Sequence, residues 1–384
     1  MHRSAILALA GLAATSCAKH TGKGHKGHKA DDDLSILAGL HTIYSYPSVA
    51  APPEELLDLT RAGLVGGVIL FGENIDSEVT PESMQALQDA YAESPAPALI
   101  ESLYGVASAP LLIMTDQEGG YVKRIKDGGP EFSAKVTGQA DDLEVSGSEA
   151  GSQAAETLTR YNNNANLAPV LDTYFEAGNF IDATERSYNN ESAKVSEAGV
   201  AFLKAQQEAG VAATAKHFPG LGKAPKGSNT DEVPVTLNTT AEELDAVDIA
   251  PFADAIAAGI YMIMPSWAIY PAVDAKFPAG LSTKWLKEKL RGELGFEGVT
   301  ISDAIEAGSL TNYGGIDEIV TQATVAGMDI LLASARDVQQ GIDVRTALEE
   351  AVSSGAVDRA EFDAATKRII KVRAALGAAK AKHV

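Results

Sequence analysis

The chain has 384 residues and a formal net charge of −21, and its hydrophobic and charged fractions are those of an ordinary soluble globular protein. The negative charge argues against a nucleic-acid partner, because phosphate binding needs clustered Lys and Arg. The single cysteine, Cys17, excludes a disulfide within the chain and a thiolate metal cluster.

The first 17 residues have the pattern of a secretory signal. A short basic start precedes an apolar stretch of about a dozen residues, which is too short to span a bilayer as a mature helix, and small residues precede Cys17. The position of Cys17 resembles that of the lipid-modified cysteine in bacterial lipoprotein signals. We therefore expect an extracytoplasmic protein whose lipid anchor on Cys17 holds it at a membrane. An ordinary signal peptide and a secreted protein are the alternative.

Residues 18–33 lack hydrophobic periodicity and core-forming side chains, which is typical of a flexible tether. His20, His25 and His28 could bind a metal weakly, but a solvated spacer is the favoured interpretation. The sequence predicts no metal site and no cofactor.

Seven short apolar runs follow, and each ends abruptly in polar or glycine-rich residues. Continuous runs of this kind are typical of strands buried on both faces, and hence of a parallel sheet. The runs with their polar ends span residues 65–74, 109–120, 164–172, 211–220, 261–267, 298–306 and 327–334.

Segments with helical spacing alternate with these runs, for example at residues 192–210, 241–259 and 281–294. Seven or eight strand–helix units over this length predict an α/β fold, a (β/α)8 TIM-type barrel that forms a single domain over residues 34–384. A doubly wound sheet is the alternative, but no glycine fingerprint follows the first strand.

Polar residues that could carry chemistry come directly after the apolar runs. They are Asp116, Asp172, Lys216 with His217, and Asp303. Active sites of barrels are built at the C-terminal ends of the strands, so we expect these side chains to meet in one site.

Six segments also carry motifs in a characteristic order. They are DQEGGYVKR (116–124), NLAPVLD (166–172), ERSY (185–188), AKHFPGLG (215–222), FPAGLS (277–282) and LRGELGFEGVTISDAI (290–305).

This set resembles the successive signatures of glycoside hydrolase family 3, specifically its single-barrel β-N-acetylhexosaminidase-like branch. The resemblance covers roughly residues 60–335 and implies that Asp303 is the catalytic nucleophile. It also implies hydrogen bonds to the hydroxyls of the sugar in the cleaved-side subsite. The residues implied for these bonds are Asp116, Arg124, Arg186, Lys216 and His217.

The chemistry of these residue types agrees with the resemblance. A retaining glycosidase needs one carboxylate as nucleophile and a second group as acid and then base. Lys216 and Arg186 are expected to help keep Asp303 ionised and to supply directional donors for a pyranose ring.

The chain departs from the family pattern in two places. Tyr121 stands where the family usually has arginine, which implies the loss of one basic contact. The loop after residue 222 reads GSNTDEV where the hexosaminidase branch has Asp-Ser-His, whose histidine serves as acid/base. Alignment of the two puts Asp231 in place of this histidine and Asn229 in place of its partner, with Glu232 as the fallback. We also expect this loop to be a mobile flap.

Three functions remain open from the sequence. The first is a retaining hydrolase of terminal β-linked sugars, with β-N-acetylhexosaminides of cell-wall or related glycans as the best guess. The second is a β-glucosidase-like activity of the same family. The third is a non-catalytic carbohydrate-binding lipoprotein that lacks the acid/base. The sequence leaves the oligomeric state open.

Overall fold

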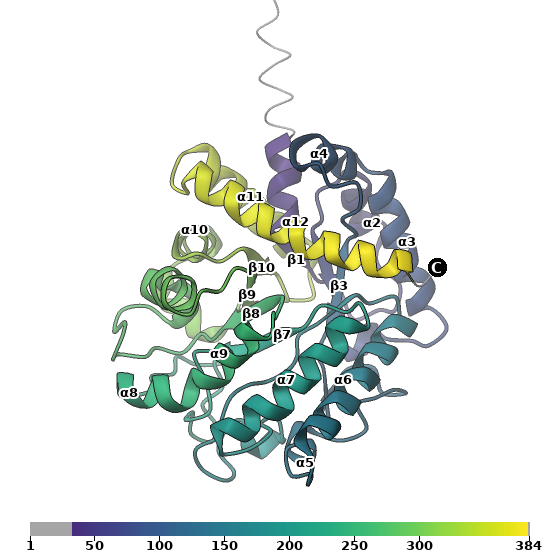
Figure 1. Ribbon diagram of the computed structural model, residues 1–384. Coiled ribbons are helices and arrows are strands. Elements are labelled where there is room, and N and C mark those ends of the chain that lie inside the picture. Colours follow the sequence, from purple (N-terminus) through teal and green to yellow (C-terminus); the bar gives the residue numbers. More distant parts are fainter. Residues whose placement is uncertain (1–32, 383–384) are drawn as a thin grey trace, which may run out of the picture.

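The computed structural model describes residues 33–382, which fold as a parallel α/β barrel (Figure 1). Eight parallel strands form the sheet, in the order β6-β3-β2-β1-β10-β9-β8-β7. Their bounds are β1 Thr42–Tyr44, β2 Gly67–Ile69, β3 Leu112–Thr115, β6 Ala165–Asn166, β7 Thr214–Phe218, β8 Met262–Pro265, β9 Val299–Ala304 and β10 Ile330–Leu332.

The two ends of this sheet meet and close the barrel. Parallel bridges pair Ala165 with Ala212 and Val170 with Lys216, and the Leu171 N–H donates to the carbonyl oxygen of Lys216 at 2.7 Å. Each strand therefore neighbours the next barrel strand along the chain, which confirms the predicted TIM-type fold. The seven predicted runs all contain a strand. The eighth strand, β1, was not among them because it lies between polar His41 and Ser45 and forms no continuous apolar run.

Alternation along the strands decides which side chains face the barrel interior. On β9, Val299 and Ile301 point into an apolar cluster, and Asp303 follows two residues later. On β3, Leu112 and Met114 point into the same cluster, and Asp116 follows in the same register. The apolar interior thus ends in a layer of polar side chains at the C-terminal ends of the strands.

Helices surround the strands, as Figure 1 shows. In α7, buried Val195, Ala198 and Phe202 recur at the spacing of one helix face. The stretch predicted as one helix over 241–259 is divided into three segments, and Pro251 lies in the first turn of the third. Residues 33–40 are also helical. The α-helices are α2 Glu54–Arg61, α3 Thr80–Glu93, α4 Pro95–Tyr104, α5 Ala134–Thr137, α6 Leu143–Arg160, α7 Ser192–Glu208, α8 Ala241–Glu243, α9 Ala250–Ala257, α10 Ile316–Ala326, α11 Val338–Ser353 and α12 Arg359–Lys382.

Shorter or differently wound segments complete the chain. The π-helix η3 (Leu244–Asp248) joins α8 to α9, and the π-helix η5 (Lys284–Glu293) occupies the predicted helix at 281–294. A small antiparallel hairpin follows β3. Its strands are β4 Gln117–Gly119 and β5 Val122–Lys123. The 3-10 helices are η1 Gly72–Asn74, η2 Asp182–Thr184, η4 Ala279–Leu281 and η6 Gly308–Tyr313.

Helix α12 closes the end of the barrel where the strands begin. Ile369 and Val372 join the apolar cluster of the barrel interior, and Arg373 donates to the carbonyl oxygen of Pro110 at 2.7 Å, just before β3. Because α12 covers this end, the site lies at the opposite, C-terminal end. None of the helices within residues 33–382 has the length and apolar character that a membrane crossing requires.

Candidate active site

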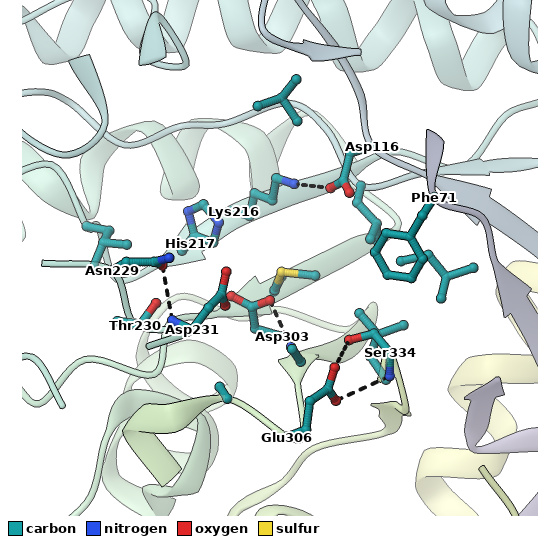
Figure 2. Close-up of a pocket in the computed structure, with 18 of the residues that line it drawn as sticks. Phe71, Asp116, Lys216, His217, Asn229, Thr230, Asp231, Asp303, Glu306 and Ser334 are labelled. Carbon is teal, nitrogen blue, oxygen red and sulfur yellow. Dashed lines mark hydrogen bonds and ion pairs between the residues drawn. The ribbon is translucent and has the colours of Figure 1, made fainter. Parts of the chain in front are cut away.

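A pocket of about 450 Å³ opens at the C-terminal ends of the strands. Its floor is apolar, built by Ile69, Leu167, Met264 and Leu332, and its walls carry the polar residues that follow the strands. Figure 2 shows how these side chains converge from separate elements. The charged and polar residues that line it are Asp116, Arg124, Arg186, Lys216, His217, Asn229, Thr230, Asp231, Asp303, Glu306, Ser334 and Arg336.

A network of buried charges forms one wall of the pocket. The Lys216 ammonium on β7 donates to Asp116 Oδ1 at 2.7 Å and to Glu118 Oε1 at 2.8 Å. The Arg186 guanidinium binds both oxygens of Glu118, each at 2.9 Å. Arg124 lies 3.3 Å from Asp116 Oδ2. Two carboxylates therefore fix the positions of three cations.

Burial and ion pairing shift the pKa values of the two carboxyl groups in opposite directions. Burial raises the pKa of the Asp116 carboxyl, but the positive charges of Lys216 and Arg124 outweigh it and lower the pKa below its usual range. The pKa of Glu118 is lowered in the same way by Arg186 and Lys216 against burial. Both carboxylates stay ionised at neutral pH, so the wall presents fixed donors and acceptors to a ligand.

The imidazole of His217 is held by a buried carboxylate. Asp172, which is fully buried, lies 2.7 Å from His217 Nδ1, and it also accepts the N–H groups of His217 at 3.1 Å and of Leu221 at 2.6 Å. Nε2 of His217 lies 3.5 Å from Arg186 Nη2, which can only donate. This arrangement places the proton on Nδ1 and leaves Nε2 as an acceptor on the pocket side.

Asp303 lies on β9 at the centre of the pocket (Figure 2). The N–H of Ala304 donates to its Oδ1 at 2.8 Å. Among the described residues no cation forms an ion pair with Asp303, since Lys216 and Arg186 pair with Asp116 and Glu118 instead. The two cations therefore form no direct ion pair with Asp303, and the expectation that they help keep it ionised stays a prediction.

The loop between β7 and β8 brings Asp231 to the pocket. The Asp231 N–H donates to Asn229 Oδ1 at 3.1 Å, and Figure 2 shows the carboxyl groups of Asp231 and Asp303 facing each other. Asp231 is solvent-exposed and lines the pocket. Partial desolvation by the surrounding protein, and then the negative charge of Asp303, raise the pKa of Asp231 from 3.8 to about 6.

The loop residue after Asp231 lies differently. Glu232 is exposed and is not among the residues that line the pocket, and it accepts a hydrogen bond from Asn229 Nδ2 at 3.2 Å. Asp231 is therefore the carboxyl of the loop that reaches the cavity.

The structure brings the predicted catalytic and sugar-binding residues within 33–382 into one pocket. They are Asp116, Arg124, Arg186, Lys216, His217, Asp231 and Asp303. Glu118 was not assigned to the site from the sequence, although it holds Lys216 and Arg186 there. Glu118 could have been found from its place inside the DQEGG motif. Asp172, which was expected in the site, lies behind His217 and does not line the pocket. Tyr121 is exposed and does not line the pocket, and the expected loss of a basic contact there stays a prediction.

The remaining predictions concern the N-terminal segment and metal binding. Cys17, the signal segment and the histidines of the tether lie outside the described residues. Within residues 33–382 no cluster of three or more His, Cys, Asp or Glu side chains is arranged to hold a metal ion.

Comparison with known proteins now defines the family. Residues 40–372 match the glycosyl hydrolase family 3 N-terminal domain. The chain belongs to glycosyl hydrolase family 3. It is 44% identical over 346 residues to an uncharacterized secreted glycosyl hydrolase of Arthroderma benhamiae, with 90% of this chain and 95% of the relative covered. It is 36% identical over 282 residues to a β-hexosaminidase of Tolumonas auensis, with 72% and 77% covered.

Solved structures agree with this family. A family 3 β-N-acetylglucosaminidase from a Paenibacillus species matches with a TM-score of 0.81 and 32% identity over 89% of this chain. The chain spans 63% of the length of that protein. A β-N-acetylhexosaminidase from Beutenbergia cavernae matches with a TM-score of 0.75 and 28% identity, covering 88% of this chain and 98% of that one. The family and its β-hexosaminidase members support a glycosidase that cleaves β-linked sugars.

Proposed function

We propose that the protein is a retaining glycoside hydrolase that removes terminal β-linked N-acetylhexosamine from glycans, with Asp303 as the nucleophile. The observation that carries the proposal is the pair of facing carboxyl groups, Asp303 and Asp231, in one pocket. A retaining mechanism needs such a pair, with one group ionised and the other protonated. The pKa of about 6 at Asp231 supports its role as the protonated partner.

In the first step, an Asp303 oxygen attacks the anomeric carbon while the bond from that carbon to the leaving oxygen breaks. Asp231 gives its proton to the leaving oxygen, and the sugar becomes an ester of Asp303. In the second step, Asp231 takes a proton from water, the water oxygen bonds to the anomeric carbon, and the ester bond to Asp303 breaks. An ionised Asp231 repels phosphate at this stage, so hydrolysis dominates over phosphorolysis.

The remaining wall of the pocket holds the sugar. Asp116 supplies acceptors, His217 lines the same wall beside Arg186, and Lys216, Arg124 and Arg186 supply donors at positions fixed by ion pairs. A pyranose carries hydroxyls that both donate and accept, so this mixed wall suits it. Fixed donors and acceptors also orient the anomeric carbon toward Asp303.

Two other functions are separated by one experiment. A β-glucosidase-like enzyme of this family shares the mechanism, and a non-catalytic sugar-binding protein shares the wall of the pocket. The purified protein is assayed with a panel of aryl β-glycosides that includes the N-acetylglucosaminide and the glucoside. The proposal expects the N-acetylglucosaminide to be hydrolysed fastest. A faster glucoside supports the first alternative, and binding without hydrolysis supports the second.

We also propose an extracytoplasmic location with a lipid anchor at Cys17. The support is the signal-like segment at residues 1–17 and the name of the Arthroderma relative, which describes that protein as secreted. Replacing Cys17 with Ser is expected to release an active protein into the medium, because the acyl chains supply the membrane affinity. Wild-type protein that is already free in the medium would contradict the anchor.

A further inference from the structure

The proposed function uses one side of the pocket and leaves the opposite side unassigned. The residues proposed to hold the sugar lie on β7 or follow β3, the β4–β5 hairpin and β6. The unassigned residues Phe71, Glu306, Ser334 and Arg336 follow β2, β9 and β10, which belong to the other half of the barrel. Asp303 lies between the two sets, and in the view of Figure 2 Glu306 and Ser334 lie beyond it from His217.

Glu306 is fixed by neutral donors only. Ser334 Oγ donates to Oε1 at 2.7 Å, whereas the Ser334 N–H at 3.3 Å and Gln340 Nε2 at 3.0 Å donate to Oε2. Gln340 is itself buried, and its own Oε1 accepts the N–H of Ala335 at 2.9 Å. The Glu306 carboxylate is therefore held in place while its charge forms no ion pair with any cation in residues 33–382.

One oxygen of Glu306 keeps an open acceptor position. Each carboxylate oxygen has two lone-pair sites. Oε2 accepts two hydrogen bonds from the described residues, but Oε1 accepts only one. Because Glu306 is exposed and lines the pocket, the remaining site on Oε1 is available to a hydroxyl donor in the cavity.

Arg336 forms the adjoining rim in an unusual conformation. Its backbone has φ of 60°, in the left-handed region that non-glycine residues adopt at a cost of about 1–2 kcal/mol. The N–H of Arg336 donates to Ser45 Oγ at 2.8 Å, and the guanidinium stacks 4.5 Å from the ring centre of Phe71. Backbone strain of this kind persists where the surrounding structure enforces it and is concentrated at ligand sites.

We propose that Phe71, Glu306, Ser334 and Arg336 form the leaving-group subsite, which binds a second sugar residue of an oligosaccharide. This inference rests on the proposed function, because Asp303 must lie under the anomeric carbon. The leaving group then extends away from the Asp116–Lys216 wall, toward these four residues. Glu306 Oε1 accepts a hydroxyl of the second sugar, and the Arg336–Phe71 stack supplies a flat rim against one face of its ring.

The substitution Glu306→Gln tests this subsite without removing its framework. With its amide oxygen at the Oε2 position, the substituted side chain still accepts from Ser334 N–H and Gln340. Its NH2 group then donates to Ser334 Oγ, which can also accept. The variant keeps the local contacts but replaces the open acceptor with a donor. The assay compares N,N′-diacetylchitobiose, which has a sugar leaving group, with the aryl N-acetylglucosaminide.

We expect the ratio of kcat/KM for the disaccharide to kcat/KM for the aryl glycoside to fall about threefold to tenfold in Glu306→Gln, because a neutral hydrogen bond replaces a charge-assisted one. Glu306→Ala is expected to lower the ratio at least as much. Glu318→Gln is the matched control. Glu318 is an exposed carboxylate outside the pocket, and within residues 33–382 it accepts only the Gly315 N–H, at 2.9 Å. An unchanged ratio in both Glu306 variants overturns the subsite.

Binding measurements separate this inference from the proposed function. Calorimetric titration of Asp303→Asn with N-acetylglucosamine and with N,N′-diacetylchitobiose gives the affinity added by the second sugar. Adding Glu306→Gln to Asp303→Asn is expected to reduce that increment and to leave the monosaccharide affinity within about twofold. Absence of hydrolysis by the wild type would reject the enzyme, whereas loss of the increment would still support the subsite. No increment for the second sugar would reject the subsite alone.

Discussion

The N–H of Gly308 donates to the carbonyl oxygen of Asp231 at 2.7 Å, which ties the β7–β8 loop to the segment that follows Asp303. A second bond runs from the Ser309 N–H to the carbonyl oxygen of Thr230 at 3.2 Å. The segments that carry the two candidate catalytic carboxyls are therefore joined by backbone hydrogen bonds. The predicted flap is docked in this structure with Asp231 over the pocket, and its mobility stays a prediction.

Asp231→Ala is expected to depend on the leaving group of the substrate. Activity on a disaccharide should fall on the order of 10²- to 10⁴-fold, because the leaving oxygen then lacks a proton donor. An activated aryl glycoside should lose much less, and azide should restore part of the second step as a nucleophile that needs no base. Steady-state rates on both substrates measure this. Equal losses on both would remove Asp231 from the mechanism.

The pH profile provides a second test of Asp231. The first step needs this carboxyl protonated, so kcat/KM of the wild type for the disaccharide should fall as the pH rises through about 6. This basic limb should be absent from the residual activity of Asp231→Ala. A basic limb that stays at the same pH in the variant would assign it to another group.

Gly308→Ala is expected to weaken the docking of the loop. A Cβ at this position would lie 2.2 Å from the carbonyl oxygen of Glu232, a backbone atom that cannot move without the loop. We expect about a tenfold loss of kcat/KM on the disaccharide and a smaller loss on the activated aryl glycoside, because Asp231 is displaced. Gly315→Ala is the control, since its nearest neighbour is the flexible Glu318 side chain at 3.3 Å. Equal losses on the two substrates would contradict the link to Asp231.

Glu118→Gln is expected to destabilise the fold at neutral pH. The change leaves buried Lys216 and Arg186 without one of their counter-charges, and breaking such a pair costs about 3–5 kcal/mol. The folded-state pKa of Glu118 lies below its usual value of 4.5. Its stabilisation is therefore complete above that pH and is lost as the pH falls toward the folded-state value.

Denaturant unfolding at pH 7 and near pH 4 measures this effect. The difference in unfolding free energy between wild type and Glu118→Gln should be largest at pH 7 and smaller at pH 4. Glu101→Gln, at an exposed position on α4, should change little at either pH. The same difference at both pH values would show that the charge of Glu118 is not its cause.

Asp248→Asn is expected to stabilise the protein at alkaline pH. Asp248 lies behind the turn at Gly220, is almost completely buried, and its Oδ2 has no hydrogen-bond partner among the described residues. Burial raises its pKa from 3.8 to about 7. Ionisation in the folded state is thus unfavourable, and this penalty grows as the pH rises from about 4 through 7.

The asparagine cannot ionise, so the variant should gain a few kcal/mol at pH 8, at about 1.4 kcal/mol per pKa unit. The gain should vanish near pH 4. Thermal unfolding of both proteins across this range is the measurement. A loss of stability that does not depend on pH would contradict this prediction. It would mean that the Asp248 carboxyl contributes to packing and that its ionisation in the folded state costs little.

Most of the pocket residues were predictable because the alternation of side chains along a strand can be read from a few neighbouring residues. A run such as VTIS followed by Asp303 places a polar side chain at the end of a buried strand, and the barrel topology then gathers such ends. The partners of those residues were harder to predict. Whether Lys216 pairs with Glu118 or with Asp303 depends on side-chain geometry between separate strands, which residue spacing does not determine.

The residues of the proposed leaving-group subsite were also not predicted from the sequence. Arg336 has a left-handed backbone that no glycine or asparagine signals. The strand β1 lies between polar His41 and Ser45, so no continuous apolar run marks it. Both become evident only when the neighbouring elements are in place.

Covalent trapping tests the central assignment most directly. A fluorinated N-acetylglucosaminyl donor forms the glycosyl-enzyme faster than water can release it, and mass spectrometry of the digested protein locates the sugar. We predict one modified peptide with the sugar on Asp303, and no modification in Asp303→Asn. A sugar attached to Asp231, to Glu306 or to any other carboxylate would contradict the account.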